Sequence, residues 1–251
     1  MQNQNQPRQA PKSDTETIPL GAIDRAIPNG YAPLGAVCYS ASGRFEIMDD
    51  DARLPAPNPA GARTALTAPR AADDAALLFA LAAHRRVLES WRTSMDLVGP
   101  GPVDPHFDDA NEAVRTLHVH GRWLDLGSGA GFPGVALAAW HPNAAVTLVE
   151  RRQKRAAFLE VVLGAARLSN ASVHCGDADQ LPIGWDGMIS RAFRAPQEVA
   201  ALAARLLVPG GRLVLMLARD ESGTPAGFIE DYVHSYTIEG KARRAVVLQR
   251  Q

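Results

Sequence analysis

The chain has 251 residues, of which 46% are hydrophobic, enough for one good-sized domain with a packed core and an appendage. Its 26 Lys and Arg nearly balance its 27 Asp and Glu, which excludes an overall basic character and leaves only a local basic surface for any nucleic-acid partner. The cysteines Cys38 and Cys175 lack metal-ligand spacing, so we expect no disulfide framework, no bound metal and a reducing, cytoplasmic location. No apolar run approaches the roughly 18 residues of a membrane span, and we expect no membrane partner.

Residues 1–70 differ in texture from the rest of the chain. Proline, glutamine, asparagine and alanine interrupt every apolar period there, so little apolar surface is available to offset the entropy of ordering. We predict an irregular, partly disordered N-terminal extension, with one β-hairpin or packed loop that turns at residues 40–43. This segment is interpreted as an appendage or linker and is given no function.

Residues 71–120 are predicted to form an N-terminal helical region. Apolar residues recur at helical spacing after Asp73 and Asp74, either of which can cap a helix that runs to about Trp91. A loop rich in proline and glycine follows at residues 99–105, and a second helix is predicted over residues 108–117.

Residues 121–251 alternate apolar strands with helices, which predicts right-handed crossovers and a mainly parallel α/β sheet. Ligands bind such sheets beyond the carboxyl ends of the strands. The predicted strands are WLDLG, AVTLVE, SVHCGD, GMISRAF and GGRLVLML, the helices between them are GVALAAW, KRAAFLEVVLGAARL and EVAALAARLLV, and YTIEG with RRAVVLQ forms a terminal antiparallel pair.

The first of these strands ends in a glycine-rich loop that opens a helix. Glycines let the backbone turn sharply and approach a ligand closely. Asp125, at the end of the strand, would repel the pyrophosphate of a dinucleotide, whereas a carboxylate suits the ammonium group of S-adenosyl-L-methionine. The loop therefore favours that cofactor over NAD, its nearest rival. The predicted cofactor-binding residues here are Asp125, Gly127, Ser128, Gly129, Gly131 and Phe132.

Two later strand ends extend the predicted cofactor site. Glu150 closes the second strand, 19 residues after the last loop glycine, where an acidic residue accepts hydrogen bonds from ribose hydroxyls. Asp177 and Ala178 follow the third strand and are placed to meet the adenine. In the alternative interpretation the glycine turn is structural and Glu150 pairs with Arg151 or Arg155 on the surface.

Read as a whole, residues 124–138 (LDLGSGAGFPGVALA) end in a Gly-Phe-Pro-Gly run that resembles the RsmG (GidB) family, whose members methylate N7 of a guanine in 16S ribosomal RNA. Residues 149–162 (VERRQKRAAFLEVV) and 189–193 (ISRAF) are similar to later segments of that family, and the resemblance covers about residues 77–251. It implies a Rossmann-like, seven-stranded class I methyltransferase fold that uses S-adenosyl-L-methionine. It also implies 16S rRNA or the small ribosomal subunit as partner, and we expect a monomer.

The sequence departs from this family mainly on the substrate side. The family's Trp-Asn-Lys reads Trp91-Arg92-Thr93, and its His-x-x-Asp-Ser keeps His106 and Asp109 but loses the serine. The family's Leu-Lys-Gly reads Leu-Ala-Arg, ending at Arg219. A diverged paralogue that methylates another RNA or a small molecule is therefore the alternative, followed by a non-catalytic cofactor-binding or RNA-binding protein.

Arg191 is the leading candidate for the catalytic and substrate-binding residue. Methyl transfer depends on positioning, and guanine N7 carries a lone pair and no proton, so the reaction needs no general base. A guanidinium at a strand's carboxyl end can grip guanine O6, stack on the base or hold a phosphate, although a domain-bridging ion pair is the alternative. Phe193 is a candidate for stacking on a base or for a core position, and Arg194 is a weaker phosphate candidate.

A basic cluster opens the helix after the second strand. Arg151 and Arg155 belong to it and are candidates for contact with an RNA backbone. Cations are unfavourable at a helix N-terminus, which sets the cluster apart, and a solvated surface is the alternative. Several histidines, His84 among them, show no ligand spacing and are interpreted as structural or surface residues.

Overall fold

The computed structural model describes residues 37–39, 45–47, 71–218 and 223–251. In the N-terminal part, β1 (Val37–Tyr39) pairs antiparallel with β2 (Phe45–Ile47), as the hairpin prediction requires. The disorder predicted for the rest of residues 1–70, and the position of Arg219, lie outside the described residues. Within the described ranges no helix is long and apolar enough to cross a membrane.

Seven strands form one sheet in the order β5-β4-β3-β6-β7-β9-β8. The first five in this order are parallel to one another, and β9 runs antiparallel to both of its neighbours. Numbered from its first strand, the sheet has the order 3-2-1-4-5-7-6, which is the class I methyltransferase topology. The strands are β3 (Arg122–Leu126), β4 (Ala145–Glu150), β5 (Ala171–Cys175), β6 (Trp185–Arg191), β7 (Leu207–Leu217), β8 (Phe228–Ile238) and β9 (Lys241–Arg250).

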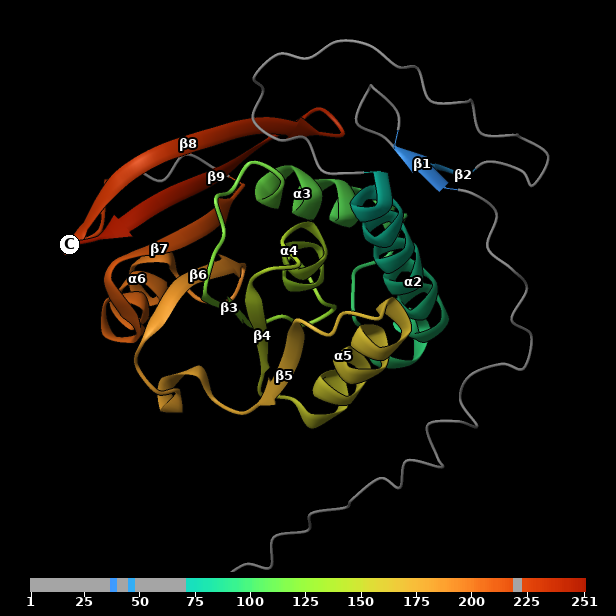
Figure 1. The fold of residues 1–251 in the computed structure, drawn as a ribbon, viewed down its shortest axis with the longest axis horizontal. Coiled ribbons are helices and arrows are strands. Elements are labelled where there is room, and N and C mark those ends of the chain that lie inside the picture. The colour runs from blue at the N-terminus through green and yellow to red at the C-terminus, as the bar shows by residue number, and fades with distance from the viewer. Residues whose placement is uncertain (1–36, 40–44, 48–70, 219–222) are drawn as a thin grey trace, which may run out of the picture. The chain divides into compact units, whose positions relative to one another are not determined.

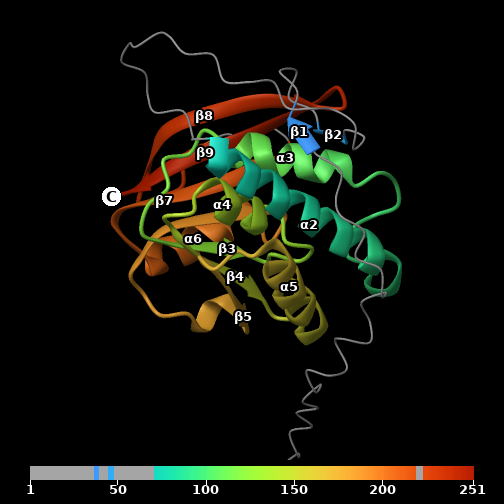
Figure 2. The ribbon, with the colours of Figure 1, turned by 45° about the vertical axis from the view of Figure 1, so that its right-hand side comes forward.

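Helices cover both faces of the sheet (Figures 1 and 2). Because successive strand residues point to opposite faces, Trp123 packs with four helices on one side and Leu124 packs with α6 on the other. The first group comprises α2 (Ala71–Met95), α3 (Asp104–Val114), α4 (Gly134–Trp140) and α5 (Gln153–Ala166), and the other face carries α6 (Pro196–Leu206) and the short 3-10 helix η1 (Ala178–Gln180).

The ends of the two N-terminal helices differ from the predicted ones. Helix α2 begins at Ala71 and ends at Met95, so Asp73 and Asp74 lie inside its first turn and not at the N-cap position. Helix α3 begins at Asp104, which places Pro105 in its first turn and not in the preceding loop. Proline is tolerated there because the first backbone N–H groups of a helix have no partner within the helix.

Candidate functional site

The glycine loop joins β3 to α4 at the carboxyl edge of the sheet. Gly127, Gly129 and Gly131 have φ angles of +71°, +55° and +92°, a region that side chains disfavour. A Cβ atom on Gly127 would lie 2.5 Å from the Phe193 ring, and one on Gly131 would lie 2.9 Å from Val135. A Cβ on Gly129 would meet no atom closer than 3.7 Å. The first and last glycines are therefore required by packing, whereas a Cβ at Gly129 would make only ordinary van der Waals contacts, so the loop has room for a ligand there.

Asp125 is completely buried beneath this loop. Its Oδ2 atom accepts a hydrogen bond of 3.0 Å from the backbone N–H of Gly134, and its Oδ1 atom has no partner. Burial raises the pKa of this carboxyl to about 6, against the opposing effects of Ser128, of the Gly134 N–H and of the positive charge of Arg191. A buried carboxylate with one unsatisfied oxygen fits a cationic ligand group and disfavours a pyrophosphate.

The loop is held to the neighbouring strand by its own backbone. The N–H groups of Gly127 and Ser128 donate to the carbonyl oxygen of Val149 at 2.9 and 3.0 Å. The hydroxyl of Ser128 donates to the carbonyl oxygen of Asp125 at 3.0 Å and is buried. Ser128 therefore lies in the loop as predicted, with its hydroxyl directed into the protein.

Glu150 ends β4 beside the same loop and is only 6% exposed. Its Oε2 atom accepts from the N–H of Gly129 at 3.2 Å, and its Oε1 atom accepts from the N–H of Arg152 at 2.8 Å. Among the residues described, Glu150 forms no ion pair with Arg151 or Arg155, so that alternative is wrong. Two amides fix this carboxylate in place, and each oxygen keeps a lone pair for a ligand hydroxyl.

The loop after β5 is tied down by two arginines. Asp177 accepts a hydrogen bond from the N–H of Asp179 and caps η1, which contains the buried Ala178. Arg194 pairs with Asp177 at 3.4 Å and with Asp179 at 2.7 Å. Arg205 donates to the carbonyl oxygens of Ala178, Asp179 and Leu181. Arg194 therefore orders the predicted adenine loop, which is a different role from the predicted phosphate contact.

Arg191, at the end of β6, forms an ion pair with Asp109 of α3, with 3.2 Å between Nη1 and Oδ2. The ion pair that was the alternative interpretation is thus present. Its guanidinium also lies 5.0 Å over the ring of Phe132 in the glycine loop, and the His106 ring stacks on that same ring at 5.7 Å. The predicted substrate residue and the predicted cofactor loop are therefore in contact.

The backbone turns sharply immediately after Arg191. Ala192 has a φ of +52°, which is uncommon for a residue with a side chain and costs backbone strain. It allows Arg191 to reach Phe132 while the next residue, Phe193, lies against Gly127. Phe193 is therefore part of the packing that covers the loop, the alternative to base stacking. Nothing in the residue types signals this strain, so the sequence could not reveal it.

His84 of α2 is a site residue that the sequence analysis placed only among structural or surface positions. It is fully buried, and its Nε2 atom lies 2.7 Å from the carbonyl oxygen of Ala130. Burial lowers its pKa to about 4, so the ring is neutral at pH 7 and its Nε2–H donates to the loop. The available signal was a single histidine on an otherwise apolar helix face.

One residue of the basic cluster, Arg155, lies beside Gly129 of the glycine loop. Arg155 donates to the carbonyl oxygen of Asp96 at 2.9 Å, and a Cβ on Gly129 would lie 3.8 Å from its Nη1 atom. Arg151 is exposed at the beginning of the same segment. No group of three or more metal-ligating side chains occurs in the described part of the chain.

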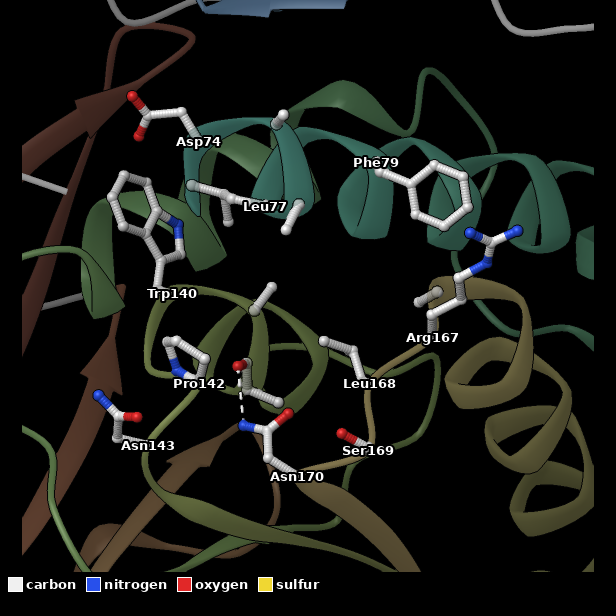
Figure 3. Close-up of a pocket in the computed structure, with 15 residues that line it drawn as sticks. Asp74, Leu77, Phe79, Trp140, Pro142, Asn143, Arg167, Leu168, Ser169 and Asn170 are labelled. Atoms are coloured by element: carbon white, nitrogen blue, oxygen red, sulfur yellow. Dashed lines mark hydrogen bonds between the residues drawn. The ribbon is translucent and has the colours of Figure 1, made fainter. Parts of the chain in front are cut away.

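A separate hollow lies at the end of the sheet away from the glycine loop (Figure 3). Trp140, Phe79 and Arg167 line it together with Asn143 and Asn170. Because Asn143 lies two residues before β4 and Asn170 directly precedes β5, this hollow lies at the amino ends of the strands. The glycine loop and Glu150 lie at the carboxyl ends, so the hollow is not the predicted cofactor site.

Comparison with known proteins identifies related sequences. A family model described as rRNA small subunit methyltransferase G matches residues 80–226. Proteins named ribosomal RNA small subunit methyltransferase G are similar to the chain: that of Ralstonia nicotianae is 36% identical over 145 residues, which are 55% of this chain and 65% of that protein. The Xanthomonas euvesicatoria protein is 31% identical over 189 residues, 71% of this chain and 89% of that protein. A Syntrophobacter fumaroxidans protein, numbered G 1, is 31% identical and covers 64% and 77%.

Proposed function

Because the chain belongs to the rRNA small subunit methyltransferase G family, we propose that it transfers the methyl group of S-adenosyl-L-methionine to N7 of a guanine in 16S ribosomal RNA. The chain spans 65% of the length of the Ralstonia relative. Its activity and its RNA partner are therefore proposals. Action as a monomer and the cytoplasmic location stay predictions.

The observations that carry the cofactor assignment are the room for a ligand beside Gly129 and, beneath the same loop, the unsatisfied Oδ1 atom of Asp125. An ammonium group in this position would gain a charge-assisted hydrogen bond and relieve the cost of the buried carboxylate. Glu150 would accept the ribose hydroxyls. Asp177 and Ala178 would face the adenine, in a loop that Arg194 and Arg205 already hold. Phe132 would complete the wall beside the glycines.

When bound, S-adenosyl-L-methionine supplies an electrophilic methyl group. The protein then has to align the acceptor nitrogen, because an in-line displacement depends on orientation. Arg191 is suited to this alignment, since it ends the strand next to the cofactor loop and presents a planar fork that can grip guanine O6. Arg155 and Arg151 would hold the RNA backbone near the loop. Guanine N7 needs no proton removed, so no general base is assigned.

The assay that tests this function measures transfer of labelled methyl groups to small ribosomal subunits and to bare 16S RNA. Wild-type protein should label one of them. Arg191→Ala should bind S-adenosyl-L-methionine with wild-type affinity by isothermal titration and should transfer the label about 100-fold more slowly than the wild type, because the acceptor is no longer aligned. Undiminished transfer by this variant would contradict the role of Arg191.

A changed target is the second candidate, and Arg92 favours it. Where the sequence motif of the family has asparagine, this chain has Arg92. The Arg92 guanidinium donates to the carbonyl oxygen of Gly101 at 2.6 Å and holds the loop between α2 and α3. This loop leads into His106 and Asp109. Labelling of another RNA, with neither ribosomal substrate labelled, would support the diverged paralogue.

A further inference from the structure

The hairpin of β8 and β9 arches over α3 (Figure 1). Side chains on one face of β8 are hydrogen-bonded to that helix and to the turn after it. Every second residue of a strand points to the same side, and residues three to four positions apart lie on the same side of a helix, one turn from each other. The two periods match here, so that three side chains of β8 each reach a different turn. The pairs are Tyr232 with Thr116 at 3.3 Å, His234 with Glu112 at 3.4 Å and Tyr236 with Asp109 at 3.0 Å.

The last of these contacts ends on Asp109, the carboxylate that holds Arg191. The side chain of Asp109 is only 12% exposed. Its Oδ1 atom accepts the hydroxyl of Tyr236, and its Oδ2 atom pairs with Nη1 of Arg191. Arg243 of β9 lies 3.9 Å from Oδ1. The hairpin therefore contributes a donor and a cation to a carboxylate whose other oxygen faces the proposed substrate residue.

The hydroxyl of Tyr236 remains a donor throughout the range in which the protein would work. Burial, together with the negative charge of Asp109, raises the pKa of the phenol well above its usual value. With Oδ1 occupied by this donor, the carboxyl plane of Asp109 is fixed. A guanidinium is planar and rigid, so a fixed partner at Nη1 and the Phe132 ring beneath it restrict the orientation of Arg191.

We propose that Tyr236 is a positioning residue for methyl transfer, which orients Arg191 through Asp109 and makes the C-terminal hairpin part of the target side of the site. The inference rests on the proposed function, because it requires Arg191 to act on the RNA. It adds a residue that lies 45 positions after Arg191 in the sequence and belongs to none of the motifs that carry the family resemblance.

The chain supplies a matched control for the test. Tyr232 lies on the same face of β8 and donates to the backbone of the turn after α3, without contact to Asp109. Tyr236→Phe and Tyr232→Phe each remove one hydroxyl that joins the hairpin to this region. We expect Tyr236→Phe to lower the single-turnover rate of methyl transfer about 5-fold, the effect of one hydrogen bond, and to leave the KM for S-adenosyl-L-methionine unchanged. Tyr232→Phe should transfer at the wild-type rate.

A double-mutant cycle with Arg191→Ala, measured with excess enzyme, shows whether Tyr236 acts through Arg191. The effect of Tyr236→Phe should disappear in the Arg191→Ala background. Equal rates for the two tyrosine variants, or an undiminished effect of Tyr236→Phe without Arg191, would overturn the inference and leave the proposed function intact. Full transfer by Arg191→Ala alone would instead show that the proposed role of Arg191 is wrong, and the inference would fail with it.

Discussion

Asp125 and His84 each form a hydrogen bond with the backbone of residues 130–134 and change the stability of the protein with pH in opposite directions. The pKa of Asp125 is raised from 3.8 to about 6, so between these values the folded protein holds a proton that the unfolded chain releases. The free energy of unfolding then falls as pH rises through this range. The pKa of His84 is lowered from 6.5 to about 4, so its contribution rises over nearly the same range. The two effects largely cancel in the wild-type protein.

The variant Asp125→Asn separates these two effects of pH, because it removes the titration of Asp125 and leaves that of His84. The variant removes a buried charge but keeps an acceptor for Gly134. A shift of two pKa units corresponds to about 3 kcal/mol, and the new unpaired amide offsets part of it, so we expect a gain of about 1–2 kcal/mol in the free energy of unfolding at pH 7.5. The gain should shrink as pH falls from 6 to 4, as denaturant titrations at several pH values would show. A gain that grows toward acid pH would contradict the account. Binding of S-adenosyl-L-methionine should weaken, because an amide cannot neutralise an ammonium.

Gly129 and Gly127 give opposite predictions for the same substitution. Gly129→Ala has room in the folded protein and should cost only about 1–2 kcal/mol of stability, for a side chain in the left-handed region. It should nevertheless abolish binding of S-adenosyl-L-methionine by isothermal titration, because the new methyl group occupies the ligand's space. Gly127→Ala meets Phe193 and should destabilise the fold by more. Wild-type affinity in Gly129→Ala would show that the cofactor does not approach this glycine.

The residues whose placement the sequence predicted best are those that belong to a local pattern in the chain. Asp125 and Glu150 each end a strand next to a loop, a local pattern that can be read directly. The partners of Arg191 could not be predicted this way: Asp109 is 82 residues earlier, and Tyr236 reaches Asp109 across 127 residues. A long-range ion pair leaves no periodic signal in a single sequence.

At the scale of whole elements, the strands and helices of residues 121–251 were predicted correctly in type and order, because each has a clear apolar period. Their ends were less accurate. The terminal pair, predicted over five and seven residues, extends to 11 and 10 residues as β8 and β9. Half of β8 faces α3 with polar side chains, so it lacks the regular alternation of apolar and polar residues that marks a strand. The side chains that obscured the prediction, Tyr232, His234 and Tyr236, are those that join the hairpin to α3.

The turn between β8 and β9 offers a test at this scale. Its two residues, Glu239 and Gly240, both have positive φ angles, of 49° and 74°, as a type I′ turn requires. Asparagine tolerates the first position far better than glutamate. Glu239→Asn should therefore raise the free energy of unfolding by about 0.5–1 kcal/mol in denaturant titrations. A loss of stability would mean that Glu239 makes a contact worth more than the strain of its backbone.

For the molecule as a whole, the ring of Phe132 is where distant parts of the chain meet. It contacts His84 of α2, His106 and Phe107 of α3, and Arg191 of β6. The hairpin of β8 and β9 is connected to this ring indirectly, because Tyr236 donates to Asp109 and Asp109 pairs with Arg191. The family model spans residues 80–226 and so includes the helices as well as most of the sheet. The predicted fold and family are confirmed, whereas the division into segments at residues 70 and 120 stays a prediction.

The central claim is that this protein methylates N7 of a guanine in 16S rRNA. The modified atom can be identified directly. Small ribosomal subunits and bare 16S RNA are incubated with the protein and S-adenosyl-L-methionine, and the RNA is then cleaved at N7-methylguanine by borohydride reduction and aniline treatment. We predict one new cleavage site in the 16S RNA, which Arg191→Ala should produce about 100-fold more slowly than the wild-type protein. Binding of the cofactor without any new cleavage in either substrate would contradict the claim.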